Sequence, residues 1–442
     1  MEADELALVD DGNLNVQMAA AAKGLGVLTT GLFLVGEVAG TGVLALPRAV
    51  VDTGWIGLFL IAVAACMLGY TGIILGRCWT IVKERFPEKY GGHTRYPYPA
   101  IGSEAFGKVG RYSVRFCVIF TMFGASVVFL LLAADNMHNL VGKSLNFCQW
   151  PPIIAACLIP LCWLGTPKDF WVVATGASMS TGLAALLLFV QSVIQIPAEP
   201  PNHTSPTVIS FFTAFGTIVF AFGGHGAFPT IQHDMREPRR FYLSICIGYC
   251  TTFLIYFPVA AAGYFVFGDT FIELDTDNIL HVISKGAIHT IVTVMIMMHL
   301  VLSFVICINP VFQEIEEAFC IPLKFNWKRV VLRTLVLGLV LFTGETIPHF
   351  GTILSLVGGS TVTLQAAVFP PLFYLRLNSM EDSTGVWKKR QLSLHHKVIL
   401  IEISLIGVVG GAASTFSVIY SMATGASQFT VPCYVNSTGA HL

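Results

Sequence analysis

The sequence predicts an all-α protein that crosses a membrane many times. Of its 442 residues, 55% are hydrophobic and only 12% are charged, a composition far more apolar than that of a soluble protein of this length. The apolar residues gather into long runs, and a helix of roughly 20 such residues crosses a bilayer core about 30 Å thick. The joins between the runs alternate between basic and almost uncharged. Together these observations predict a polytopic helical membrane protein.

Eleven apolar runs are assigned as membrane spans. They lie at residues 25–51, 55–82, 112–141, 152–166, 170–196, 208–229, 242–267, 279–312, 329–346, 351–375 and 397–424. The transmembrane domain is therefore expected over 25–424, between an N-terminal tail at 1–24 and a C-terminal tail at 425–442. Residues 1–11 are acidic and provide no positive n-region, so we expect the first span to be retained rather than cleaved.

The basic residues predict an orientation. With the N-terminus in the cytoplasm, every Lys and Arg falls on the inner side except Arg48, Lys143 and Lys285, as the positive-inside rule requires. Two glycosylation-type triplets, Asn202-His-Thr and Asn436-Ser-Thr, then both fall on the outer side. We expect a multi-pass protein with a cytoplasmic N-terminus, in the plasma membrane or in a lysosomal or vesicular membrane.

Most of the 11 cysteines lie within apolar runs and show no metal-ligand spacing, so they are expected to be small buried residues. Cys148 and Cys433 are the exceptions, since both fall on the predicted outer side. That side is oxidising, so a disulfide between them is one expectation and a pair of free thiols is the other.

The first span has a centre unsuited to a continuous helix. The stretch from Phe33 to Arg48 contains Gly36, Gly40 and Gly42, and each glycine costs about 1 kcal/mol against Ala in a helix. Glu37 adds an ionisable group near mid-membrane, where charge is expensive. Interrupted membrane helices leave free N–H groups that suit anionic substrate groups and free carbonyls that suit cations. The alternative is that the glycines only allow a neighbouring helix to pack closely.

The sixth span repeats this anomaly. Residues 219–229 place three glycines and His225 within an apolar run. The first span enters from the inside and the sixth, after five spans, enters from the outside. Two sets of five helices in opposite orientation, each opening with a broken helix, are typical of an inverted-repeat transporter whose binding site lies between the breaks. The eleventh span is then an addition to the repeat.

Several stretches resemble the amino acid/auxin permease family, which includes the proton-coupled, the vesicular inhibitory and the sodium-coupled neutral amino acid transporters. The resembling stretches are Gly40-Thr-Gly-Val-Leu-Ala-Leu-Pro, Gly54-Trp-Ile-Gly, Tyr98-Pro-Ala-Ile-Gly-Ser-Glu-Ala-Phe-Gly, Phe228-Pro-Thr-Ile-Gln-His-Asp-Met-Arg-Glu-Pro-Arg-Arg-Phe, Phe267-Gly-Asp and Ile347-Pro-His-Phe-Gly-Thr-Ile-Leu-Ser-Leu-Val-Gly-Gly. The resemblance implies an eleven-helix, LeuT-like inverted five-helix fold and secondary transport of amino acids. Glu37 and the glycine-rich Phe222-Gly-Gly-His-Gly depart from what the family would have here, so the substrate class stays open.

The expected function is secondary active transport of small neutral amino acids by alternating access, coupled to protons. The alternatives are a sodium-coupled symporter and an amino-acid-sensing receptor with the same fold. The expected partners are the amino acid, H⁺ or alternatively Na⁺, and the lipid bilayer. We expect no cofactor, no metal and no nucleic acid.

Backbone groups at the two breaks are the candidate substrate site. Gly40, Thr41 and Gly42 are expected to hold the substrate carboxylate through N–H groups. Phe220, Phe222, Gly223 and Gly224 are expected to form the opposite wall, although the two aromatic side chains would also serve as packing groups. These seven residues are the predicted binding set.

Four ionisable or polar residues are candidates for coupling: Glu37, His225, His299 and Ser303. An intramembrane ionisable side chain is a functional hypothesis by default. For Glu37 the competing interpretation is an acid that caps free N–H groups of the second half-helix. For His299 it is a neutral histidine bonded between helices.

Other classes of protein are excluded by missing motifs. The sequence has no Gly-x-x-x-x-Gly-Lys-Ser/Thr loop for an ATP-driven pump, no metal cluster and no nucleophile elbow, so no enzyme is predicted. A channel needs a continuous polar path, and the spans offer only isolated polar residues.

Overall fold

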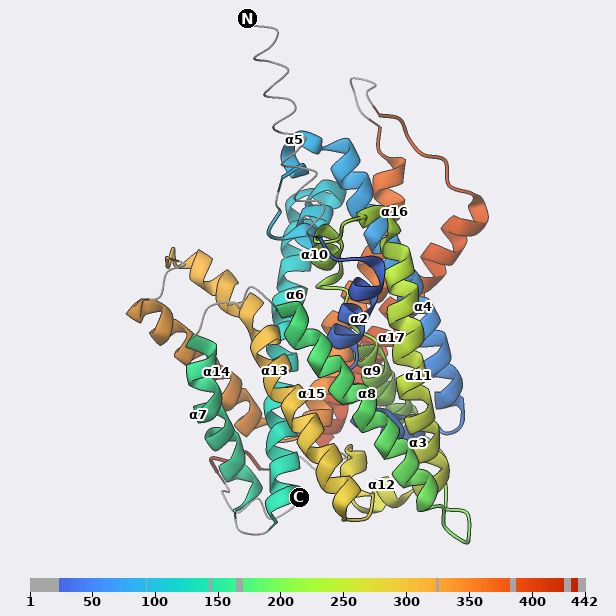
Figure 1. The fold of residues 1–442 in the computed structure, drawn as a ribbon. Helices are drawn as coiled ribbons and strands as arrows, with labels where there is room; N and C mark the ends of the chain where they lie inside the picture. Colours follow the sequence, from blue (N-terminus) through green and yellow to red (C-terminus); the bar gives the residue numbers. More distant parts are fainter. Residues whose placement is uncertain are drawn as a thin grey trace, which may run out of the picture.

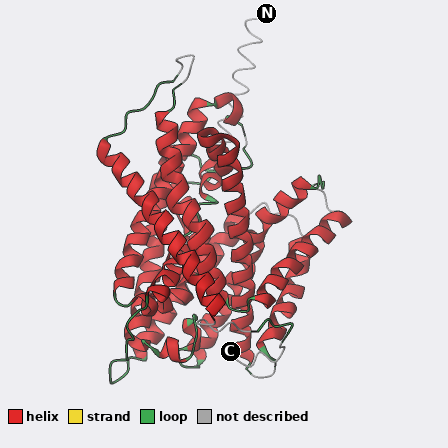
Figure 2. Cartoon of the chain, turned by 180° about the vertical axis from the view of Figure 1, so that it is seen from behind, coloured by secondary structure: helices red, strands yellow, loops and turns green. Residues whose placement is uncertain are grey.

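The computed structural model describes residues 24–435 except 93, 143–144, 164–169, 323–325, 382–386 and 425–430. For residues 170–175 it describes the backbone only. The described residues are helical and form no strand, apart from one isolated bridge between Leu25 and Met235. The prediction of an all-α protein is confirmed, as Figure 2 shows.

The helices form one elongated bundle (Figure 1). Their bounds are α2 Val27–Val38, α3 Gly42–Thr53, α4 Ile56–Arg85, α5 Pro87–Tyr90, α6 Pro97–Val141, α7 Trp150–Trp163, α8 Phe170–Ile194, α9 Val208–Ala221, α10 Phe228–His233, α11 Phe241–Phe267, α12 Thr270–Glu273, α13 Ala287–Ala318, α14 Trp327–Thr346, α15 Phe350–Val357, α16 Phe369–Ser379 and α17 Leu394–Thr424. Short 3₁₀ turns cover η1 Phe147–Gln149, η2 Pro238–Arg240 and η3 Ile279–His281. Two π turns, η4 Gly358–Val362 and η5 Leu364–Val368, join α15 to α16.

Length and hydropathy support fewer spans than the sequence predicts. Among the described residues, 7 helices are long and apolar enough to cross a membrane, or 8 if α2 and α3 count as one bent span. The shorter helices α7 and α9, and the 20-residue helix α14 with its three basic residues, occupy the remaining predicted ranges. The count of eleven spans and the inverted repeat therefore remain predictions, whereas a multi-pass membrane protein is established.

One predicted boundary is wrong. The range 279–312 was expected to be a single span, but α13 begins at Ala287, and 279–281 form a separate turn in the preceding loop. The apolar signal extended too far because Ile279 and Leu280 are buried side chains of that loop rather than helix residues. We call residues 268–286 the α11–α13 loop.

The bundle has two chemically different ends. In Figure 1, α5 and α10 lie toward one end, and α3 and α12 lie toward the other. The first end carries many basic side chains, including Arg85, Arg95, Arg239 and Arg390, and is named the basic face. It is the end that the charge pattern predicts to be cytoplasmic.

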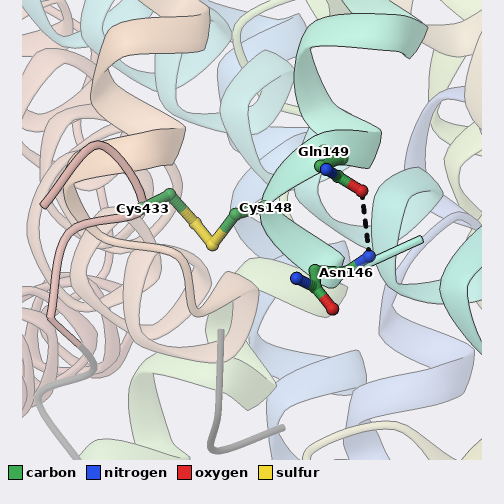
Figure 3. Close-up of a disulfide and its surroundings, with 4 residues drawn as sticks. All are labelled: Asn146, Cys148, Gln149 and Cys433. Carbon is green, nitrogen blue, oxygen red and sulfur yellow. Dashed lines mark hydrogen bonds between the residues drawn. A yellow bond between two sulfur atoms is a disulfide. The ribbon is translucent and has the colours of Figure 1, made fainter. Parts of the chain in front are cut away.

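The opposite end carries a disulfide and is named the disulfide face. Cys148, in η1 before α7, is bonded to Cys433 in the segment after α17 (Figure 3). The backbone N–H of Cys433 also donates to the carbonyl oxygen of Glu345 at the end of α14, 2.8 Å away. Of the two expectations for these cysteines, the disulfide is therefore the one observed.

A buried ion cluster holds α14 against α13 and α7. The carboxylate of Glu316 accepts from Arg329 Nε at 3.0 Å and from Arg333 Nε at 2.6 Å. Arg333 is 1% exposed and also donates to the carbonyl oxygen of Cys162 at 2.7 Å. Removing the carboxylate would leave two buried guanidinium groups without their shared anion.

Candidate functional site

A cavity of about 630 Å³ runs from the centre of the bundle to the basic face. Its inner end is lined by the first break and by the segment between α9 and α10. Its mouth is lined by residues of the basic face, among them the exposed Arg95. No residue of the α11–α13 loop lines it, so among the described residues the cavity opens toward the basic face and ends before the disulfide face.

The first span is broken where the sequence predicts. α2 ends at Val38 and α3 begins at Gly42, and the two helices are bent by 59° relative to each other. The hydroxyl of Tyr256, on α11, spans the break: it donates to the carbonyl oxygen of Val38 and accepts from the N–H of Gly40, both at 3.0 Å. Each group lost its helical partner at the break, so Tyr256 compensates both.

Tyr256 also explains why position 42 is glycine. A Cβ atom there would lie 2.7 Å from the Cβ of Ala221 and 2.9 Å from the hydroxyl oxygen of Tyr256. Both distances are shorter than van der Waals contact, so a side chain would displace the tyrosine or α9. Thr41 and Gly42 stand at the start of α3, where helical N–H groups begin without an intrahelical acceptor.

His299 lies directly beside this break. A Cβ on Gly40 would lie 3.1 Å from Nε2 of His299. Nδ1 of the ring is 2.9 Å from the hydroxyl oxygen of Thr181 and 3.2 Å from the carbonyl oxygen of Ala177, and we assign the hydrogen of the neutral ring to Nδ1 because the carbonyl can only accept. Nε2 then accepts from the hydroxyl of Ser303 at 3.2 Å and turns its lone pair toward the break.

The sixth predicted span is also interrupted. α9 ends at Ala221, α10 begins at Phe228, and the residues between them are not helical. The hydroxyl of Tyr249 donates to the carbonyl oxygen of Phe222 at 2.9 Å, which satisfies the end of α9. Two tyrosines of α11, Tyr249 and Tyr256, therefore each hold one of the two breaks.

His225 is held in the second break by α4. Its Nε2 is 3.1 Å from the carbonyl oxygen of Leu68 and 3.2 Å from the hydroxyl oxygen of Thr71. Its ring packs against Phe228, with ring centroids 4.7 Å apart. These contacts give His225 a structural role in addition to its position on the cavity wall.

Most of the predicted site residues meet around one cavity. Those that line it are Glu37, Gly40, Thr41, Gly42, Phe220, Gly223, Gly224, His225, His299 and Ser303. Phe222 does not line it, since its fully buried ring packs between Tyr249 and Tyr256, with centroids 6.4 and 5.6 Å away. The prediction placed Phe222 on the wall because sequence spacing does not show which way a ring turns at the end of a helix.

Sequence reasoning missed a polar group on the far wall. Gln365, in the π turn η5, donates from Nε2 to the hydroxyl of Thr121 at 2.6 Å, and Thr121 lies 2.7 Å from the hydroxyl of Thr361. Gln365 and Thr121 both line the cavity. No periodicity marked Gln365, because it becomes part of the wall only where the tenth predicted span widens into π turns.

Charged pairs border the mouth. Arg115 of α6 donates to the carboxylate of Glu314 on α13 through Nε at 2.6 Å. Tyr96 donates to Glu317 at 2.8 Å, and Arg95 lies 3.4 Å from the same carboxylate. At the mouth, basic side chains on or just before α6 therefore pair with acidic side chains on α13.

The remaining predictions fall elsewhere. Asn202 lies in the exposed segment between α8 and α9, where its carbonyl oxygen accepts from the N–H of Asp269 at 3.0 Å. Asn436 is outside the described residues. Within the described part of the chain, no group of three or more His, Cys, Asp or Glu side chains is arranged to hold a metal ion.

The fold and the cavity define the class: a multi-pass helical membrane protein with an internal cavity between two interrupted helices. A family model described as "Transmembrane amino acid transporter protein" matches residues 23–416. The chain therefore belongs to this family of amino acid transporters and is not an enzyme. The resemblance seen in the sequence is confirmed.

Individual relatives agree with the family. The chain is similar to Amino acid transporter AVT1E of Arabidopsis thaliana, with 29% identity over 397 residues that cover 86% of this chain and 70% of that protein. It is similar to Amino acid transporter AVT1D of the same plant, with 27% identity over 400 residues covering 87% and 68%. Amino acid transporter AVT3B matches with 25% identity over 397 residues, covering 86% and 90%.

Proposed function

We propose that the protein is a proton-coupled secondary transporter of small neutral amino acids that works by alternating access. The observation that carries the proposal is the cavity, which joins the two helix breaks to the basic face and ends before the disulfide face. A transporter needs a site reachable from one side at a time, whereas a channel needs an open path. We infer that this structure represents the state open to the basic face.

The end of the cavity that lies deepest in the bundle is suited to a small zwitterionic substrate. The substrate carboxylate is assigned to the start of α3, where the N–H groups of Thr41 and Gly42 lie at the positive end of the helix dipole. The N–H of Gly40 is already bonded to Tyr256. Glycines line much of the wall at the break, and the arginines that line the cavity lie at its mouth, so an anionic substrate side chain would meet no arginine near the break. Glu37 is the acid there, and once protonated it offers no charge to a cationic side chain.

Coupling is assigned to Glu37, with His299 as the neighbouring acceptor. Glu37 occupies the last turn of α2 and lines the same cavity as the start of α3. An ionised carboxylate there would repel a substrate carboxylate, and protonation removes that repulsion. Proton and substrate would then bind together, and Nε2 of His299 offers a second proton acceptor beside the break.

Uptake into proteoliposomes tests the coupling. Radiolabelled neutral amino acids are offered at several outer pH values, with and without sodium, to the wild type, Glu37→Gln and Glu402→Gln. Glu402 is a matched control because it is an acid exposed on the outside of α17. We expect sodium-independent uptake that rises with acidity in the wild type and the control, and that loses this dependence in Glu37→Gln.

Two results would contradict the proposal. Unchanged pH dependence in a well-folded Glu37→Gln protein would remove Glu37 from the mechanism and leave His299 and His225 as candidates. Uptake that requires sodium at every pH would replace proton coupling by sodium symport through carbonyls at the break.

The basic face is assigned to the cytoplasm. The excess of Arg and Lys on this face supports the assignment. The disulfide supports it too, since such bonds persist in oxidising compartments and not in the cytosol. Glycosylation of Asn202 in cells, removed by Asn202→Gln, is the expected result; protease protection of a tag at the basic face of sealed cells follows from the same orientation.

A further inference from the structure

A buried polar cluster lies under the α11–α13 loop on the disulfide face, away from the substrate cavity. Asn278 of the loop donates from Nδ2 to Asp135 at 2.8 Å and to Asn136 at 3.0 Å, both on α6. The ring of His281 lies with Nε2 3.2 Å from an oxygen of Asp135. Nδ1 of the same ring is 3.0 Å from the hydroxyl of Thr276.

The loop is held at two further points. Arg48 of α3 donates to the carbonyl oxygen of Phe271 at 2.6 Å while pairing with Asp52 at 3.0 Å. Asp277 lies 3.3 Å from Nδ1 of His349, which precedes α15. Side chains on α3, on α6 and directly before α15 therefore all contact this one loop.

The loop closes the bundle at this end. Phe271, Ile279 and Leu280 are 0%, 0% and 1% exposed, so the loop inserts apolar side chains between the helices as a plug. The substrate cavity ends before it. For the cavity to open toward the disulfide face, the loop must lift away, and its contacts with α3, α6 and α15 must break.

We propose that this cluster is a second proton-binding site, separate from Glu37, in which protonated His281 pairs with Asp135 and latches the α11–α13 loop shut. The proposal rests on alternating access but not on proton coupling through Glu37. Arg48 is permanently charged, so its contact with the loop does not depend on pH, whereas the His281–Asp135 pair responds to the pH of the compartment that the disulfide face contacts.

The groups facing His281 support this assignment. Burial lowers its pKa, but Asp135 outweighs that effect and raises the pKa of His281 above its ordinary value, while Lys285 opposes the rise. His289 on α13 binds the carbonyl oxygen of Leu280 at 3.1 Å and adds no negative charge. Around Arg48 the acids are Asp52, Asp275 and Asp277. The cluster thus holds more acids than permanent cations, and protonation of His281 would reduce this excess of negative charge.

The direction of the pH effect follows from linkage. When the loop lifts, His281 is exposed and its pKa returns toward the ordinary value near 6.5, so closing the loop takes up protons. The stabilisation of the closed loop is complete below that ordinary value. It is lost as the pH rises through the higher pKa of the closed state. An acidic outer compartment therefore favours the state open to the basic face.

Hydrogen exchange measured on the full chain in lipid nanodiscs tests the latch without any transport assay. Exchange of the α11–α13 loop is compared at about pH 5.5 and about pH 7.5 after correction for intrinsic exchange rates. In the wild type we expect the loop to open at least about threefold more often at the higher pH. His281→Gln and Asp135→Asn should each reduce or abolish this difference.

A matched control is available in the neighbouring outer segment. His203 is an exposed histidine whose ring stacks on Tyr264 with centroids 4.3 Å apart, and no carboxylate of the described residues forms an ion pair with it. His203→Gln should keep the wild-type response. Equal loop protection at both pH values in the wild type would overturn the latch, as would a wild-type response in both His281→Gln and Asp135→Asn.

The outcomes separate this inference from the proposed function. A loop that is insensitive to pH in a protein with proton-driven uptake would overturn the latch and leave the coupling by Glu37 intact. A pH-sensitive loop in a protein whose uptake needs sodium would support the latch and contradict the coupling.

Discussion

Adding one methyl group at position 42 is the most direct perturbation of the first helix break. In Gly42→Ala the new Cβ atom would lie 2.7 Å from the Cβ of Ala221 and 2.9 Å from the hydroxyl oxygen of Tyr256. Carbon atoms in good contact are about 3.5–4.0 Å apart. Either α9 or the tyrosine must therefore move by roughly 1 Å.

The cost can be estimated from the contacts that would be lost. Moving the Tyr256 hydroxyl breaks its bonds to Val38 and Gly40, each worth about 1 kcal/mol net. Crowding a packed interior costs a further 1–3 kcal/mol or so. A cost of about 3–5 kcal/mol lowers the population of molecules with the wild-type geometry of the break by more than about a hundredfold.

Gly338→Ala is the matched control. Gly338 is an exposed helix glycine on α14, and a Cβ there would meet nothing within 4 Å. We expect uptake per folded molecule, measured in proteoliposomes with radiolabelled amino acid, to fall at least about tenfold in Gly42→Ala and to stay near wild type in Gly338→Ala. Equal uptake by the two variants would refute the link between the Tyr256 contact and transport.

Three further predictions concern the tyrosine, the disulfide and the buried ion cluster. Tyr256→Phe keeps the buried ring but removes both hydrogen bonds at the break, so we expect a raised KM and a loss of about 2 kcal/mol of stability, seen as a lower melting temperature; an unchanged KM would show that the hydroxyl only supports packing. Cys148→Ser frees Cys433 and the segment after α17, and should lower the thermal unfolding temperature in detergent, as reduction of the wild type should; a variant as stable as the oxidised wild type would contradict this. Glu316→Gln leaves two buried arginines without their shared anion and should destabilise the fold by about 3–5 kcal/mol, seen as a lower melting temperature and poor yield; a normal melting curve would be the opposing result.

The helices, the two helix breaks and the family could be predicted from the amino-acid sequence, because they depend on composition and on local backbone chemistry. Long apolar runs are helices in the structure because a backbone in lipid must satisfy its hydrogen bonds internally. Both breaks lie where glycines weaken the helix, because a residue without a Cβ, such as Gly40 or Gly42, leaves the helical conformation at little cost in free energy. The family could also be identified, because its motifs are contiguous stretches of residues.

Properties that depend on contacts between distant segments were decided only by the tertiary structure. Tyr256 is separated from Gly40 by 216 residues, and nothing in its own apolar surroundings marks it as the partner of a break. Phe222 follows the sequence pattern of a wall residue, yet its ring turns into the packing around Tyr249. The predicted span 279–312 began with Ile279 and Leu280 because they are apolar, but they are apolar because the loop itself is buried. A pattern along the chain shows that a side chain is hidden from water, and only the folded structure decides which atoms cover it.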